Sequence, residues 1–188
     1  MDQKKLEQAA RLIIEAVGED PEREGLVETP RRFAEMVAEQ LAYAAVPNEE
    51  IARAFDKTFS SPESDMVVVK DISLFSHCEH HIALMYNMKA AVGYIPRGRV
   101  IGLSKIARIA DAVSKRLQIQ ERIGADIRDV MERITGAGDV IVLLEGEHSC
   151  MTARGIRKPG TLTRTISASG RFLSLIHISE PTRQAEIS

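Results

Sequence analysis

Two short clusters in this sequence hold residues that could bind a metal ion. The first is HCEHH at residues 77–81, and the second is HSC at residues 148–150. Zinc prefers thiolate and imidazole ligands, and a catalytic zinc typically has three protein ligands and one water. Structural zinc commonly uses CxxC pairs, and this chain has none. Two thiols and one imidazole therefore predict a catalytic centre, provided that the chain turns sharply between Cys78 and a histidine three positions later.

This arrangement would suit hydrolysis, because zinc can lower the pKa of a water to roughly 7. Two further histidines, His80 and His148, flank the candidate ligands and could transfer protons. The alternative for each is an outer partner that only orients a metal ligand. For the cysteines, the alternative is that they are unpaired thiols in the core.

A third cluster, IGLSKIARI at residues 101–109, predicts an anion site without a P-loop. Ser104 and Lys105 stand at an expected helix start, where free backbone N–H groups and the helix dipole favour an anion. Arg108 follows one turn later, and Arg154 lies close after the second metal cluster. The alternative is an ordinary solvated basic face.

Glu121 lies in LQIQERI at residues 117–123, among side chains that we expect to be buried. A carboxylate there is either a charge on the helix surface, which is the usual case, or a hydrogen-bond acceptor for a base.

The elements that must position these residues follow from hydrophobic periodicity. Residues 3–17 predict a helix whose apolar face includes Ile13 and Val17, and Thr29 followed by a proline predicts a capped helix start. A short helix at 48–56 completes an N-terminal helical layer. Beyond residue 60, the pattern predicts an α+β core of antiparallel strands in the order β-β-α-α-β-β. The expected core elements are strands at 66–75, 88–96, 139–145 and 161–172, and helices within 104–134 that break near Leu117.

Composition excludes several other classes of protein. The chain has 188 residues and a formal net charge of -2, so nothing global indicates nucleic acid as a partner. No apolar run is long enough to span a membrane, and the first residues lack the apolar segment of a signal peptide. Two cysteines are too few for a disulfide framework, so we expect a cytoplasmic protein with reduced thiols.

The motifs together resemble the GTP cyclohydrolase I family over about residues 3–172. The matching segments are EGLVETPRR, CEHH, YIP, IGLSKIARI, QIQERI and HSCMTARGIRKPG, in the family's order. The resemblance implies a tunnelling fold and a large homo-oligomer, typically a decamer, whose sites are completed across a subunit boundary. It also implies conversion of GTP and water to 7,8-dihydroneopterin triphosphate and formate, the first step of pterin and tetrahydrofolate synthesis.

The resemblance further implies a role for individual residues. Cys78, His81 and Cys150 would bind Zn²⁺, and His80 and His148 would act as acid–base catalysts. Glu121, with Gln120 beside it, would hold the guanine edge. The triphosphate would be held by Ser104, Lys105, Arg108 and Arg154. Arg32 would join them from a neighbouring subunit.

Two other functions remain as alternatives. Reductases of the tunnelling fold need a catalytic cysteine without the CEHH pair, and its synthases use three histidines on zinc. A zinc-stabilised scaffold without turnover would be expected to lack His148, Glu121 or Lys105, and all three are present.

The last residues, 173–188, do not fit the family pattern. Leu173 to Arg183 are a codon-for-codon translation of a common transposon sequencing adapter, so we expect this tail not to be native. The alternative is a genuine divergent C-terminus. We therefore divide the chain into an N-terminal helical region at 1–60, a tunnelling-fold catalytic core at 61–172, and this tail.

Overall fold

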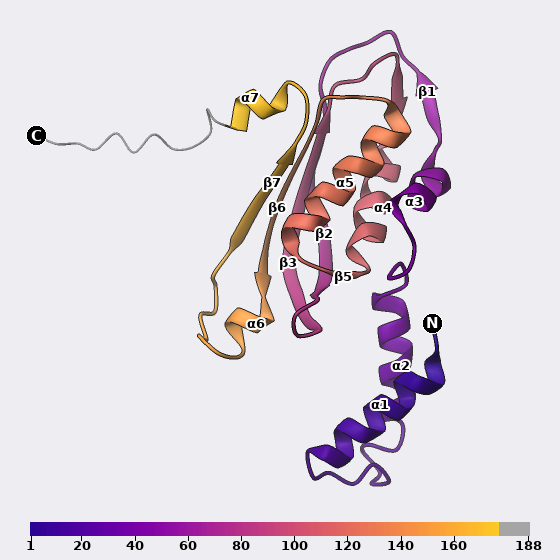
Figure 1. Cartoon of the computed structure of the whole chain (residues 1–188), viewed down its shortest axis with the longest axis vertical. Coiled ribbons are helices and arrows are strands. Elements are labelled where there is room, and N and C mark those ends of the chain that lie inside the picture. The colour runs from indigo at the N-terminus through magenta and orange to yellow at the C-terminus, as the bar shows by residue number, and fades with distance from the viewer. Residues whose placement is uncertain (177–188) are drawn as a thin grey trace, which may run out of the picture. The chain divides into compact units, whose positions relative to one another are not determined.

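The computed structural model describes residues 1–176, which form two compact units (Figure 1). The first unit is Met1–Ala45, and the second begins at Val46. The expected division near residue 60 therefore differs from the compact units, because the helix α3 (Asn48–Phe55) packs on the helices of the second unit.

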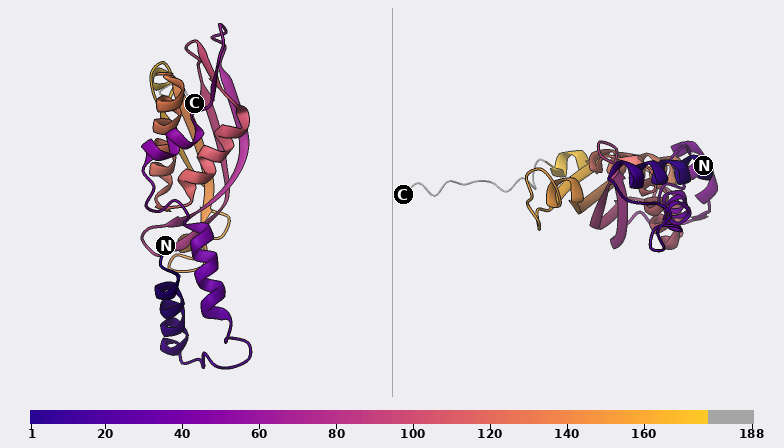
Figure 2. Two further views of the ribbon diagram at one scale, coloured as in Figure 1. Left: turned by 90° about the vertical axis from the view of Figure 1, so that its right-hand side faces the viewer. Right: turned by 90° about the horizontal axis from the view of Figure 1, so that it is seen from below.

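The first unit is a pair of helices that contact each other, α1 (Gln3–Ala16) and α2 (Thr29–Gln40), as Figure 2 shows. Asp2 caps α1 by accepting a hydrogen bond from the backbone N–H of Lys5 at 3.1 Å. The expected capping role of Thr29 is wrong, because α2 begins at Thr29 itself and has no side-chain cap.

The predicted apolar face of α1 is buried only in part. Ala10 and Ile14 are buried, whereas Ile13 and Val17 are 56% and 71% exposed. A helix with one partner buries only the narrow stripe that faces this partner, so the edges of its apolar face stay exposed.

The second unit is built on a five-stranded sheet with the strand order β5-β2-β3-β6-β7. Its long central strands β2, β3 and β6 are antiparallel, as expected, whereas the short β5 pairs with β2 in parallel. The strands are β2 (Val67–Cys78), β3 (Ala83–Tyr94), β5 (Leu117–Gln118), β6 (Val140–His148) and β7 (Thr163–Ala168).

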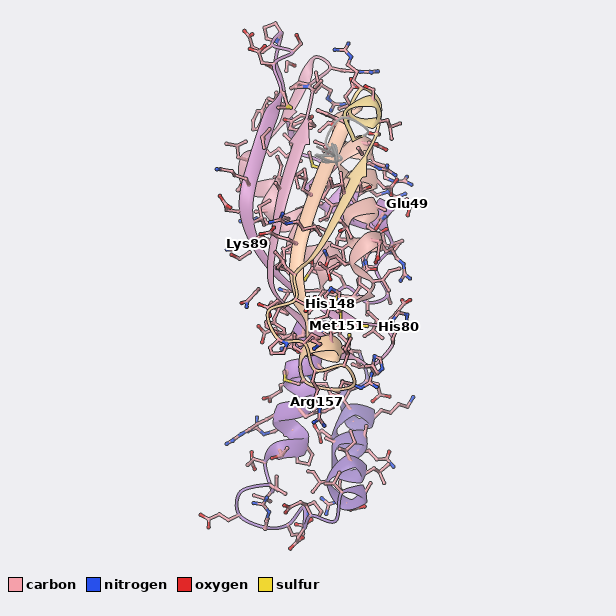
Figure 3. The ribbon with its side chains drawn as sticks, turned by 90° about the vertical axis from the view of Figure 1, so that its left-hand side faces the viewer. Glu49, His80, Lys89, His148, Met151 and Arg157 are labelled. Carbon is pink, nitrogen blue, oxygen red and sulfur yellow. The ribbon has the colours of Figure 1, made fainter. Side chains whose placement is uncertain are left out.

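Two helices cover the sheet, α4 (Leu103–Ser114) and α5 (Gln120–Thr135). They contact each other, α4 packs on β2, and α5 packs on β6 and β7. Each buries an isoleucine-rich stripe, and these stripes meet the inward-facing residues of the strands to form the core. In Figure 3, the labelled Lys89 of β3 and Glu49 of α3 lie on opposite sides of this unit.

A second, two-stranded sheet was not predicted. It pairs β1 (Thr58–Ser60) with β4 (Arg99–Ile101) in antiparallel register. Neither it nor β5 carries a clear periodic signal, because runs of two or three residues are too short to show alternation.

A short helix, α7 (Phe172–Ile176), follows β7. It includes the first residues of the tail that we expect to be adapter-derived, and residues 177–188 of that tail lie outside the described part of the chain. Within residues 1–176, no helix is both long and apolar enough to cross a membrane.

Candidate metal centre

The first half of the candidate site is the tight turn between β2 and β3. Cys78 is the last residue of β2 and pairs with Ala83, so only residues 79–82 form the connection. His81 donates its backbone N–H to the carbonyl of Cys78 at 3.4 Å. This is the sharp turn that a shared metal ion requires.

Backbone strain accompanies this turn. Ile82, which directly follows His81, has a φ of 50°, in the left-handed region that β-branched residues rarely adopt. Such strain persists only when the surrounding structure over-determines it, and it is concentrated at functional sites.

The second half of the site comes from the end of β6, where the chain enters the short helix α6 (Ser149–Thr152). His148 is the last residue of β6 and lies opposite Met85 of β3. Ser149 anchors the following turn by donating its hydroxyl to the carbonyl of Leu84 at 2.7 Å. The pairing of β3 with both β2 and β6 therefore brings the two clusters to one end of the sheet, where Figure 3 shows His80 and His148.

The predicted ligand set is brought together at this end. One ligand atom from each of Cys78, His81 and Cys150 lies within 4.8 Å of the others. Two thiols and one imidazole are a donor set that suits zinc, and three protein ligands leave a fourth position open. Burial raises the pKa of the Cys150 thiol, and the adjacent Cys78 raises it further, so a cation that stabilises both thiolates would relieve this cost.

Arg154, which we predicted to bind phosphate, contacts this ligand set directly. Its Nη1 donates to His81 Nε2 at 2.6 Å. The guanidinium is exposed beside the ligand cluster, where an anionic ligand could reach it.

The two predicted acid–base histidines have different surroundings. His80 is exposed, and its Nδ1 lies 3.6 Å from Cys78 Sγ, so it contacts a candidate ligand as an outer partner would. His148 is half-buried, and its Nε2 lies 2.8 Å from Oε1 of Gln120. Burial lowers the pKa of His148, and the negative charge of Glu121 acts in the opposite direction.

Gln120 and Glu121 begin α5 and differ in burial. Glu121 is exposed in the first turn, near enough to His148 for its charge to act there. Gln120 is buried, and both ends of its amide are bonded to protein groups. Contact of this side chain with the guanine edge therefore stays a prediction, and it would have to use the second lone pair of Oε1 or replace one of these bonds.

An ion pair that the sequence analysis missed joins the turn to α5. Arg122 donates to both carboxylate oxygens of Glu79 at 2.7 and 3.0 Å. This contact lowers the pKa of Glu79, chiefly through the hydrogen bonds. Both residues lie inside the quoted motifs, but no spacing rule shows that they pair across 43 positions.

The predicted anion cluster lies at the start of α4, whereas the end of this helix lies beside the metal cluster. Ser104 and Arg108 are exposed near the helix start, and Lys105 Nζ stands over the ring of Phe55 at 5.4 Å from its centroid. The helix end is fixed beside the metal cluster, because Ser76 Oγ donates to the carbonyl of Ser114 at 2.7 Å. Ser114 lies ten positions after Ser104 in α4, which corresponds to about 15 Å along the helix axis.

The last predicted phosphate ligand, Arg32, belongs to the first unit. It is exposed on α2, where its charge helps to lower the pKa of Glu28, although the hydrogen bond of Arg31 is the larger cause.

Comparison with known proteins identifies the family. The family model of GTP cyclohydrolase I matches residues 6–180, which include part of the tail. GTP cyclohydrolase 1 of Clostridium acetobutylicum is 55% identical over 177 residues, covering 92% of this chain and 91% of the relative. GTP cyclohydrolase 1 of Clostridium beijerinckii is 54% identical over 178 residues, covering 92% of this chain and 90% of the relative.

A solved structure of an archaeosine synthase QueF-Like protein in the apo form aligns with a TM-score of 0.45 at 18% identity, covering 58% of this chain and 96% of that one. That likeness is too distant to inform the fold or the activity. The family match and the relatives span most of the chain. The chain belongs to the GTP cyclohydrolase I family.

Proposed function

We propose that this enzyme is a zinc-dependent hydrolase that converts GTP and water to 7,8-dihydroneopterin triphosphate and formate, at the head of pterin and tetrahydrofolate synthesis. The observation that carries the proposal is the convergence of Cys78, His81 and Cys150 beside a half-buried histidine, His148. Membership of the family supports GTP as the substrate.

Cys78, His81 and Cys150 would hold the zinc ion. Zinc, when bound there, supplies a Lewis acid that makes water available as a nucleophile near neutral pH. The two cysteines can serve only as thiolates, which favours a reducing cytoplasm as the place of action.

Opening the purine ring requires proton transfers, which the two histidines can provide. Water adds to C8 of the purine, the bond from C8 to N9 breaks, and the ring nitrogen gains a proton. A second water then releases the formyl carbon as formate, and closure of the pterin ring returns one water. His148 and His80 stand beside the ligand cluster, where they can hold and move these protons.

Glu121 would bind the guanine edge, because its exposed carboxylate can accept hydrogen bonds from N–H groups of the base. It stands near His148, so the base would lie with its imidazole part toward the histidine. This placement would set the reacting carbon near the metal ligands.

Ser104, Lys105, Arg108 and Arg154 would bind the triphosphate, with Arg32 from a neighbouring chain. Within one chain, α4 separates the first three from the metal cluster, so we propose that two subunits of a decamer share each site. Nothing in the net charge of -2 favours nucleic acid as a further partner.

The decisive test is an incubation of the purified enzyme with GTP. Formate should be released in equal amount to a product that becomes a fluorescent pterin after oxidation, and a zinc chelator should abolish both. A chain that assembles and binds zinc without releasing formate would be the scaffold alternative, and the proposal would fail.

The shared site can be tested by mixing two inactive variants, Cys150→Ser and Lys105→Ala. After dissociation and reassembly together, about one quarter of the sites should combine an intact metal cluster with an intact anion cluster from another chain. Activity that does not recover in the mixed oligomers would place both clusters of each site in one chain.

A further inference from the structure

The side chain of Gln120 is held in one orientation by main-chain carbonyl groups. Gln120 is the first residue of α5, and it is 1% exposed. Its Nε2 lies 3.3 Å from the carbonyl oxygen of Leu144 and 3.0 Å from that of Thr163. Carbonyl oxygens only accept hydrogen bonds, so the atom that faces them must be the amide nitrogen, which has two hydrogens to donate.

The other end of the amide fixes the imidazole of His148. Gln120 Oε1 lies 2.8 Å from His148 Nε2. An amide oxygen can only accept, so Nε2 must carry the hydrogen of this bond. In a neutral imidazole one nitrogen is a donor and the other an acceptor, which leaves Nδ1 with the free lone pair.

We propose that Gln120 is a positioning residue that holds His148 in the Nε2–H tautomer and so makes Nδ1 the nitrogen that exchanges protons with the substrate. This inference rests on the proposed function, in which His148 takes part in acid–base catalysis. It replaces the expectation that the Gln120 side chain holds guanine, because both ends of its amide are already bonded to the protein.

The chemistry of the pair fits this role. Nε2–H donates to the amide oxygen both before and after Nδ1 takes a proton, so the bond can persist through the transfer. The bonds to Leu144 and Thr163 hold the amide against β6 and β7, and the ring orientation of His148 thereby follows from the sheet rather than from a loop. Positioning by rigid elements is what a preorganised site requires.

The first test compares Gln120→Met with a matched control, Gln118→Met. Gln118 is equally buried, but its amide donates to Val113 and Asp126 instead. In Gln120→Met, kcat should fall about 10- to 100-fold, as for other partners that orient a functional histidine, while the KM for GTP stays nearly unchanged. Gln118→Met should keep a kcat near the wild-type value, and zinc content and Tm are measured for both variants.

Two outcomes of this comparison would overturn the proposal. A raised KM with unchanged kcat in Gln120→Met would show that the side chain contacts the guanine base. Equal losses of kcat in the two variants would show that a buried glutamine is needed only for folding.

The second test reads the tautomer directly and does not depend on turnover. Solid-state NMR of the ¹⁵N-histidine-labelled enzyme, with His148→Asn for assignment, should show His148 protonated at Nε2 and bare at Nδ1. An active enzyme whose His148 carries its proton on Nδ1 would refute positioning by Gln120. Absence of formate release from the wild-type enzyme would instead refute the proposed function, so the two failures are distinguishable.

Discussion

Replacing Cys150 by serine tests the metal centre most directly. The substitution removes one of three ligands whose donor atoms lie within 4.8 Å of one another, and it leaves Cys78 as the only sulfur ligand of the set. Structural zinc sites with four ligands bind with about 10–16 kcal/mol, which averages about 2.5–4 kcal/mol for each ligand. We therefore expect Cys150→Ser to weaken zinc binding by about 10²- to 10³-fold, because 1.36 kcal/mol corresponds to a factor of ten.

The assay is zinc content after dialysis against a zinc buffer that keeps the wild-type enzyme saturated. Formate release should fall in proportion to the zinc that is lost. Ser149→Ala is the matched control, because it removes the adjacent hydrogen bond to Leu84 without removing a ligand. If Cys150→Ser binds zinc as tightly as the wild type, the three-ligand site is refuted. If Ser149→Ala loses as much zinc affinity as Cys150→Ser, the loss comes from disruption of α6 and not from removal of a ligand.

Three further predictions concern the turn and its surroundings. Glu79→Gln breaks the bidentate contact with Arg122. A partner bonded directly to a metal ligand typically contributes at least about 10-fold to metal affinity, and Glu79 is one step further away, so a zinc titration should show a loss of less than about 10-fold. Ile82→Asn should raise Tm, because asparagine tolerates a φ of 50° at a lower cost than the roughly 1–3 kcal/mol expected for strain there, and zinc content should not change. Burial lowers the pKa of His77, so near this pKa the unfolded chain binds a proton that the folded chain does not bind. The Tm of the metal-free enzyme should therefore fall as the pH drops below about 6.5, and it should fall less steeply in His77→Gln.

The metal cluster could be predicted from sequence because its chemistry is carried by residue type. Cysteine and histidine are rare in this chain, and their two clusters have few other uses. The turn between Cys78 and His81 follows from the pairing of β2 with β3. The strands expected at 66–75 and 88–96 are too far apart to predict this turn, because both observed strands extend further toward it.

The contacts that orient the site could not be predicted, because they join residues far apart in sequence. Glu79 and Arg122 each look like ordinary surface charges, and only the parallel pairing of β5 with β2 brings them together. The family resemblance implies that Gln120 lies beside Glu121 at the guanine edge. One residue along a helix turns the side chain by about 100°, so adjacent residues face different surroundings, and here one is buried while the other is exposed.

The geometry of α4 explains why one chain presents the parts of the site separately. Its last turn is fixed to β2 beside the metal cluster through Ser114, whereas its first turn carries Ser104 and Lys105 at the opposite end. The body of the helix is packed on the sheet between them and buries Ile106 and Ile109, so bending it to bring the ends together would expose the core. This separation supports our proposal that the anion cluster of each site comes from a second chain, in which case assembly would be a condition for catalysis and not only for stability.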